Sequence, residues 1–343
     1  MRRLHDRLIL TGAVALLVVV VIAALAFGAV RVPVPTVLAA LSGQLDAATD
    51  PLAQTIIMNV RLPRVVMAVA AGAGLAVAGV LMQALFRNAL ADPAIIGVSA
   101  GAALGAVATI VLGATVLAGA SRALGAWTLP IAAFAGALAA TAIVFALARR
   151  DGVLDATTML LVGIAINALS GAAIGLLIFL ATDEQLRNLT FWNLGSLAAA
   201  TWTSVSAVAP FVLLTLLVSP MLALGLNALL LGESEALHLG VQVEQLKRVV
   251  VALAAAATGA LVAMCGIIGF IGLLAPHLAR LLVGPDHRVM LPLAGLLGAA
   301  LLTLADLIAR TAVSPAELPL GVLTALVGAP VFLWLLRRRE PLR

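Results

Sequence analysis

Charged side chains that interrupt long apolar stretches are the first candidates for chemistry in this chain. Asp306 and Arg310 lie four residues apart within the apolar run LLTLADLIAR. Arg61 and Arg64 come directly before another apolar block. An acid in such surroundings is a functional candidate because an unpaired charge is costly there, and the arginine fork grips a carboxylate with two hydrogen bonds. The pattern predicts a local Asp306–Arg310 pair or arginines that reach lipid headgroups.

Other chemistries lack the residues that they need. The only lysine, Lys247, follows Leu246 rather than glycine, so this chain has no P-loop for ATP. Cys265 is the only cysteine and lies in LVAMCGIIG, which excludes a disulfide and a multi-cysteine metal site and predicts an inert buried thiol. His277, in LLAPHLAR, is the histidine to consider as a haem or iron ligand.

The composition predicts a membrane around these residues. Of the 343 residues, 64% are hydrophobic and 10% are charged, and the mean hydropathy is +1.20, whereas soluble domains carry about 25% charged residues. The 30 glycines allow helices to approach closely. The net charge of +5 comes from basic residues at the ends of apolar blocks, so it indicates membrane flanks rather than nucleic-acid binding.

Ten apolar blocks approach the length of about 20 residues that spans a bilayer. They run at about 8–29, 65–86, 94–118, 127–148, 153–181, 202–224, 249–270, 272–284, 289–310 and 318–336, and the eighth is short and broken by glycine and proline. The first has the basic flank of a signal peptide, but its apolar run is too long for a cleaved one, so we expect a retained helix. The predicted fold class is an all-α polytopic membrane protein with one transmembrane domain over residues 1–343.

An even number of spans places both termini on one side of the membrane. Fourteen of the basic residues fall on the side of the termini and six on the other, which predicts cytoplasmic N- and C-termini by the positive-inside rule. The sequence RVVMAVAA at Arg64 recurs as RVVVALAA at Arg248, five spans later. Such helices start from opposite sides, which indicates a weak inverted repeat of the kind that lets a transport pathway alternate between two openings.

The longest polar segment between two spans, residues 226–248, falls on the predicted cytoplasmic side. Its sequence Gly232-Glu233-Ser234-Glu235-Ala236 places acids where a helix dipole favours them, and Gly240 suits a helix end. The pattern predicts a short amphipathic helix at the membrane surface. That helix is either part of an ordinary solvated loop or a lever that docks on a cytoplasmic motor.

Long ordered motifs cover almost the whole chain. They are RLPR, GVLMQALFRNALADPAIIGVSAGAALGA, LNALLLGESEALHLG, GIIGFIGLLAPHLARLLVGPDHR and ADLIAR…AELPLGVLTALVGAPVFLWLLRRR. Together they resemble the FecCD family of permease subunits in type II ABC importers for vitamin B12, iron-siderophores and haem. The resemblance implies two permeases, two ATPase subunits that bind ATP and magnesium, and a periplasmic binding protein, in a bacterial inner membrane. It implies no cofactor and no catalysis on this chain.

The resemblance also implies where the partners bind. The outer helix ends would pair with carboxylates of the binding protein through Arg61, Arg64 and Arg310. The 226–248 loop would couple to the ATPase through Gly232, Glu233, Glu235, Ala236 and Gly240.

A cytoplasmic gate and a pathway follow from the same resemblance. Asn88 and Leu90 fall at the family's NPLA knuckle, where Ala89 replaces proline and relaxes the backbone of Asn88. The second constriction would be formed by Thr157 and Thr158. At both places a simple helix cap is the alternative. The polar groups of the fifth span, which would line the pathway, are Asn167 and Ser170. His277 belongs to the family's shared PHxxR motif, so we do not expect it to bind metal.

The segment TFWNLGSLAAATW, residues 190–202, and the segment 86–106 resemble the haem-importing members more than the others. We therefore predict a homodimeric permease for haem, with the pathway at the dimer interface and with ferric siderophores or vitamin B12 as alternative substrates. Two other classes of membrane protein remain possible from the sequence. One is an ion-coupled secondary transporter, for which Asp306 is the only embedded acid. The other is a membrane anchor or receptor that does not transport.

Overall fold

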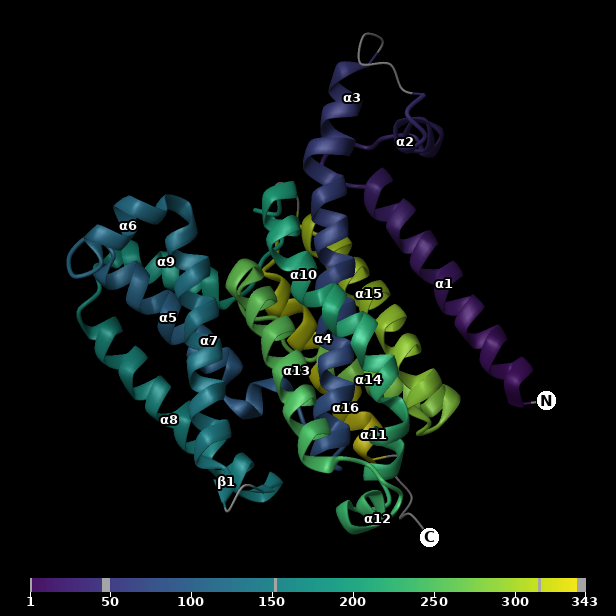
Figure 1. The fold of residues 1–343 in the computed structure, drawn as a ribbon. Helices are drawn as coiled ribbons and strands as arrows, with labels where there is room; N and C mark the ends of the chain where they lie inside the picture. Colours follow the sequence, from purple (N-terminus) through teal and green to yellow (C-terminus); the bar gives the residue numbers. More distant parts are fainter. Residues whose placement is uncertain (1, 45–49, 151–152, 314–315, 338–343) are drawn as a thin grey trace.

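The computed structural model describes residues 2–44, 50–150, 153–313 and 316–337 as a bundle of helices (Figure 1). Seven helical segments in these ranges are long and apolar enough to cross a membrane. Their main helices are α1 (Arg2–Ala26), α4 (Leu62–Leu85), α7 (Thr128–Leu147), α8 (Ala156–Phe179), α10 (Trp202–Val218), α13 (Val243–Cys265) and α15 (His287–Thr311). Three shorter apolar helices are α5 (Val98–Leu112), α14 (Ile271–Val283) and α16 (Leu320–Arg337). These ten helices follow the ten predicted spans in order, so the predicted helical polytopic fold is confirmed.

Short elements connect the long helices. They are α2 (Val34–Leu41), α3 (Pro51–Thr55), the π-helix η1 (Ile56–Arg61), η2 (Pro93–Ile96), α6 (Ala118–Leu124), η3 (Gly125–Trp127), β1 (Arg149–Arg150), β2 (Val153–Leu154), α9 (Asp183–Asn193), η4 (Ser219–Leu222), α11 (Ala223–Leu229) and α12 (Glu233–His238). Of these, only α12 was predicted, because acids mark its start and Gly240 marks its end, whereas short elements give no clear apolar period.

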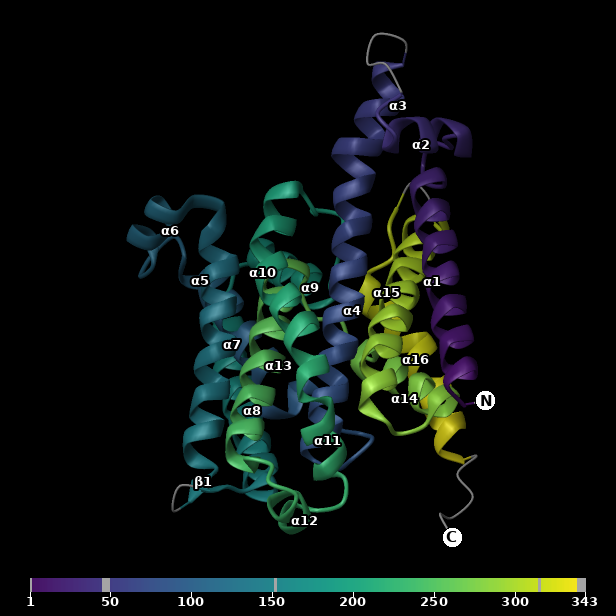
Figure 2. The same ribbon diagram turned by 45° about the vertical axis from the view of Figure 1, so that its right-hand side comes forward.

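Helix α4 lies at the centre of the bundle, where it contacts α10, α13, α14 and α15. Small residues make these contacts possible. Gly72 faces the backbone of Gly298 on α15, and Gly79 faces the backbone of Gly272 on α14. In the most apolar window of each span, 83% of the α4 segment and 72% of α13 are buried, against 22% of α1 and 11% of α8. Helices α1 and α8 therefore lie on the outside of the bundle. Figure 1 shows them at opposite edges, and Figure 2 shows α1 from the side.

The two helices of the predicted inverted repeat run in opposite directions, since α4 leads away from α3 and α13 leads away from α12 (Figure 1). The start of α1 and the described end of α16 lie at the end of the bundle that holds α12, as an even number of spans requires. We call this the α12 end and the opposite one the α3 end. Three of the counted arginines, Arg338, Arg339 and Arg343, lie outside the described residues.

Helix α14 is the short span whose boundaries the sequence left open. It begins at Ile271 after an irregular stretch, in which Gly266 and Phe270 both adopt positive φ, at 71° and 67°. The backbone N–H of Ser196 donates to the carbonyl of Cys265 at 2.8 Å, which satisfies one backbone group freed where α13 ends. The irregular backbone is thus enclosed by protein.

The contact between α4 and α14 predicts a specific sensitivity to added volume. A side chain at Gly79 would overlap the carbonyl of Gly272, whereas one at Gly12 on α1 would meet no atom within 4 Å. We expect Gly79→Ala to lower the stability of the detergent-solubilised protein by about 1–3 kcal/mol, the usual cost of overpacking. Gly12→Ala should leave the melting temperature unchanged or slightly raised, because alanine favours helix. Equal melting temperatures for the two variants would contradict this packing.

Candidate functional site

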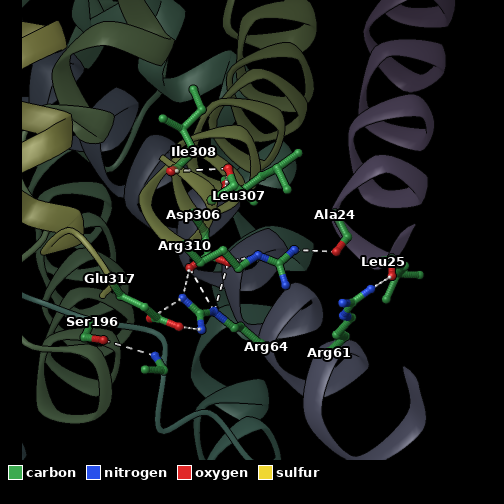
Figure 3. A network of polar contacts seen from close by, with 12 residues as sticks. Ala24, Leu25, Arg61, Arg64, Ser196, Asp306, Leu307, Ile308, Arg310 and Glu317 are labelled. Atoms are coloured by element: carbon green, nitrogen blue, oxygen red, sulfur yellow. Dashed lines mark hydrogen bonds and ion pairs between the residues drawn. The ribbon is translucent and has the colours of Figure 1, made fainter. Parts of the chain in front are cut away.

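A buried cluster of charges lies at the α3 end, where α4 begins and α15 ends (Figure 3). The Nε of Arg64 donates to both carboxylate oxygens of Asp306 at 3.0 Å, and its Nη2 donates to Asp306 Oδ1 at 2.9 Å. Nη1 and Nη2 of Arg64 also donate to the two oxygens of Glu317 at 2.8 and 2.9 Å. One guanidinium is therefore held by two carboxylates, and the contacts join α4, α15 and the segment before α16.

The carboxylates and guanidinium groups of this cluster compensate one another's charge. Asp306 is 1% exposed, and a charge that deep needs a counter-charge with good hydrogen-bond geometry. Glu317 is outside the spans, and its hydrogen bonds to Arg64 hold the pKa of its carboxyl below the ordinary value, against the opposing effect of burial. The lowered pKa keeps Glu317 ionised and paired until the pH falls through that value, and at lower pH its stabilising contribution is lost.

Arg61 and Arg310 bind the end of α1. Nη1 of Arg61 donates to the carbonyls of Leu25 and Ala26 at 2.6 and 3.0 Å, and Nη2 of Arg310 donates to the carbonyl of Ala24. The last carbonyls of a helix lack partners within it and carry its negative dipole end, so two guanidinium groups satisfy and neutralise them. Arg61 and Arg310 therefore attach the peripheral α1 to the rest of the bundle (Figure 3).

The local pair expected between Asp306 and Arg310 is only a minor contact. Arg310 Nε lies 3.7 Å from Asp306 Oδ2, whereas Arg64 reaches Asp306 with shorter and more numerous bonds. The hypothesis that these arginines simply reach lipid headgroups is also wrong for Arg61, because its side chain bonds to protein carbonyls and the residue is 4% exposed. The three arginines and Glu317 line one pocket, so the structure does bring the predicted docking residues together. Docking itself stays a prediction.

Glu317 was missed by the sequence analysis. It lies in AELPLG, a segment matched to the family only as a motif, and its distance of 253 residues from Arg64 hides the pairing. An acid placed a few residues beyond a span that already holds Asp306 and Arg310 was the available signal.

The predicted gate lies at the turn that follows α4. Asn88 is exposed, and its Oδ1 accepts from the backbone N–H of Leu90 at 2.9 Å. Arg87 before it has a φ of 47°, in the left-handed region that ends many helices. Asp92 then caps η2, because its Oδ1 accepts from the N–H of Ala94 at 2.9 Å. Asn88 thus stabilises a turn, and Asp92 is the residue that caps a helix.

Thr157 and Thr158 lie in the first turn of α8 and follow the residue that caps this helix. Asp155 is the N-cap, and its Oδ2 accepts from the backbone N–H of Thr158 at 2.7 Å and from the Thr158 hydroxyl at 2.5 Å. These hydrogen bonds lower the pKa of the Asp155 carboxyl below its ordinary value. The alternative that the threonines themselves cap the helix is therefore wrong, and Thr157 is left exposed.

The polar groups of α8 face its own subunit. Asn167 Nδ2 donates to the carbonyl of Ala94 on η2 at 3.2 Å, and Ser170, one turn later, is 5% exposed. The outer face of α8 is apolar instead and carries large exposed side chains, namely Leu161, Ile164, Leu169, Leu176 and Phe179. Asn167 joins α8 to the segment that follows the predicted gate, while the face that α8 presents outside this chain is apolar.

The predicted surface helix is present as α12. Glu233 is its first residue, Glu235 lies in its first turn, and Gly232 precedes it with a φ of 124°. Gly240 follows it with a φ of 82°, which favours glycine, so the predicted helix end is confirmed. Ala236 is the buried residue of α12, and it packs against Leu229 of α11 and Val243 of α13. Contact with an ATPase stays a prediction.

Among the described residues, His, Cys, Asp and Glu form no group of three or more that could hold a metal ion. His277 is buried in α14, and His5 and His238 are exposed at the α12 end. The described residues form a helical bundle with buried ion pairs.

The fold is that of a multi-pass membrane protein, and comparison with known proteins defines its class as a transmembrane permease. The FecCD transport family model matches residues 16–338, and the chain belongs to this family of ABC importer permeases. The hemin transport system permease HmuU of Yersinia pestis is 43% identical over 339 residues, covering 98% of both chains. The cobalamin import system permease BtuC of Halobacterium salinarum is 43% identical over 309 residues, covering 90% of this chain and 80% of that protein.

A third relative and a solved structure agree with this family. The vitamin B12 import system permease BtuC of Escherichia coli O127:H6 is 41% identical over 84% of this chain and 85% of its own length. An ABC transporter assigned to the metal-chelate type, solved in an inward-facing conformation, aligns with a TM-score of 0.84 at 35% identity over 96% of this chain and 99% of that one. ABC permeases leave ATP hydrolysis to a partner subunit, so this chain is a multi-pass membrane subunit that is not itself an enzyme.

The Arg64–Asp306 pair predicts strongly non-additive mutations. Arg64→Met leaves the buried Asp306 with only the 3.7 Å contact to Arg310, and we expect it to cost about 3–5 kcal/mol of stability in detergent. Asp306→Asn should cost less, because Arg64 keeps Glu317 as its counter-charge. The double variant should cost clearly less than the two single costs added together, because it removes both charges. Denaturation midpoints of the four proteins in a double-mutant cycle measure this coupling. Additive costs would mean that the ion pair contributes nothing.

Proposed function

We propose that this chain is the permease subunit of a haem importer and that it works as a homodimer. The choice of haem as substrate rests on the similarity to the hemin permease HmuU, because that alignment covers 98% of both chains. The alignments with the two BtuC proteins cover only 80–85% of the length of those proteins. The segment from Thr190 to Trp202 supports the same choice by resemblance. A ferric siderophore or vitamin B12 is the second candidate, because the identities to HmuU and to the archaeal BtuC are equal.

The second copy of the chain and the pathway belong at the outer face of α8. This helix is the least buried of the seven long spans, and its exposed side chains are almost all apolar. A large, partly apolar chelate passes more readily along such a wall than along one that binds it tightly. In this proposal Asn88, Leu90, Thr157 and Thr158 narrow the α12 end of the pathway, and Asn167 and Ser170 hold α8 in place behind it.

The two ends of this single permease domain serve different partners. The α3 end faces the periplasm and receives the binding protein at the pocket of Arg61, Arg64 and Arg310. The α12 end faces the cytoplasm, where residues 226–248 dock on the ATPase through Gly232, Glu233, Glu235, Ala236 and Gly240. An ion-coupled mechanism is disfavoured by the state of Asp306, because Arg64 already occupies both oxygens of this carboxylate.

Transport measurements test the proposed function directly. The chain is purified with its ATPase subunit, reconstituted into liposomes and supplied with the cognate binding protein and haem. We expect uptake that needs ATP and is insensitive to collapse of the proton gradient. Uptake without ATP that requires a proton gradient would contradict an ABC mechanism. A binding protein that binds a ferric siderophore or cobalamin and ignores haem would contradict the choice of substrate.

Docking is tested separately with the permease in nanodiscs. We expect Arg61→Glu to weaken binding of the binding protein about tenfold or more, as loss of an interfacial charge pair does. Arg122→Glu is the matched control, since Arg122 is an exposed arginine on α6 at the same end and outside the cluster. If the folded fraction of Arg61→Glu binds with unchanged affinity and only its melting temperature falls, Arg61 serves only to attach α1.

A further inference from the structure

The only lysine of the chain is buried at the α12 end. Lys247 lies in the first turns of α13 and is 1% exposed, which is rare for a lysine. Its Nζ donates to the carbonyl of Leu154 at 2.7 Å, to Glu233 Oε2 at 2.7 Å and to Glu244 Oε1 at 3.3 Å. An ammonium group has three hydrogens to donate, so these three acceptors saturate it. The lysine is therefore a junction within the chain and offers no free hydrogen to a ligand.

The three acceptors belong to three different elements. Glu233 is the first residue of α12, Glu244 is on α13 itself, and Leu154 is on β2. A compact ammonium with donors that point in several directions suits such a junction better than the planar fork of arginine. Moving any one of the three elements away would strip a partner from a buried charge, which is strongly unfavourable. The three elements are consequently held together at one atom.

The junction binds both backbone polar groups of Leu154. Lys247 binds its carbonyl, and Glu244 Oε2 accepts from its N–H at 2.9 Å. Leu154 is 1% exposed and directly precedes Asp155, the N-cap of α8. A displacement of the start of α13 is therefore passed to the start of α8 through two side chains, those of Lys247 and Glu244, which are both held at their ends by hydrogen bonds.

Helix α12 has an outward face that a partner could push. Leu237 and Leu239 are 60% and 64% exposed, while Ala236 packs inward with Leu229 and Val243. Besides that small apolar contact, the Glu233–Lys247 ion pair, at 2.7 Å, ties α12 to α13. Force applied to the exposed side of α12 thus reaches α13 and α8 through Lys247.

We infer that Lys247 is the positioning residue that transmits motion of α12 to the N-terminus of α8, and so couples ATP hydrolysis on the partner to the predicted constriction at Thr157 and Thr158. The inference rests on the proposed function and deepens it. Lys247 touches neither substrate nor nucleotide and acts only through Glu233, Glu244 and Leu154.

The test compares Lys247→Met with Arg248→Met. Arg248 is the next residue of α13 and is exposed, so its loss removes the same charge from the same turn without touching the junction. In proteoliposomes with the ATPase subunit and the haem-loaded binding protein, haem uptake and phosphate release are measured together. We expect the haem imported per ATP to fall about tenfold in Lys247→Met, within the usual range of coupling between sites. ATP hydrolysis itself should persist.

Arg248→Met should keep the wild-type ratio. A wild-type ratio in Lys247→Met would overturn the inference, and so would an equal loss of uptake and hydrolysis, which indicates general instability. Should Lys247→Met fail to assemble, Glu244→Ala decides in its place, because it removes one arm of the clamp on Leu154 and keeps the Lys247–Glu233 pair. It too must lower the ratio for the inference to stand.

A second readout does not depend on the substrate. Nitroxide labels are attached at Ser234→Cys on α12 and Val153→Cys on β2, in a Cys265→Ala background. Pulsed electron resonance then measures the distance between the two labels across the junction. Labelled chains are diluted with unlabelled ones so that only distances within one chain are measured. Ser234 and Val153 are both exposed. We expect one narrow distance that is unchanged by ATP with Lys247 present and a broadened one in Lys247→Met. Identical distributions would overturn the inference, while absence of haem uptake by the wild type would contradict the proposed function alone.

Discussion

A charge buried in an apolar bundle has to be accompanied by its counter-charge, and this requirement organises both ends of the protein. At the α3 end, Arg64 is enclosed by Asp306 and Glu317, so the beginning of α4 cannot separate from the end of α15 without exposing unpaired charge. At the α12 end, Lys247 plays the equivalent part for α12, α13 and β2. Between these two points the chain has few polar groups, and packing is left to small residues.

The helices of the bundle differ in how tightly they are packed. Helix α4 is locked against α14 and α15 by glycine contacts in which no further atom fits, and close-packed interfaces of this kind switch between discrete arrangements rather than deform gradually. Helix α8 is different, since only 11% of its most apolar window is buried in the single chain, and it packs on α5, α7 and η2. A permease that alternates access needs both kinds of helix, one group that stays together and one that can be repositioned at the pathway.

The arginines at the α3 end show how one residue can satisfy the chain and still be suited to a partner. Arg61 and Arg310 neutralise the end of α1, and Arg64 is held by two carboxylates. Their shared pocket also includes Glu317, so the end of the bundle presents both signs of charge in one place. A docking protein that offers carboxylates would compete there with Glu317 and with backbone carbonyls, which links its arrival to the contacts that hold α1 and α15.

The sequence alone determined the ten apolar helices, their order, the direction of the repeat and the surface helix at Glu233, because length, hydropathy and end signals are local properties. The family's motifs added the places of the gate and of the partner contacts. Only the tertiary structure decided which charges meet. Arg64 pairs with Asp306 across 242 positions, although Arg310 is the nearer partner along the chain, and Lys247 pairs with Leu154 across 93. Such partners are chosen by how the helices pack around a buried charge, and spacing along the chain carries no record of that choice.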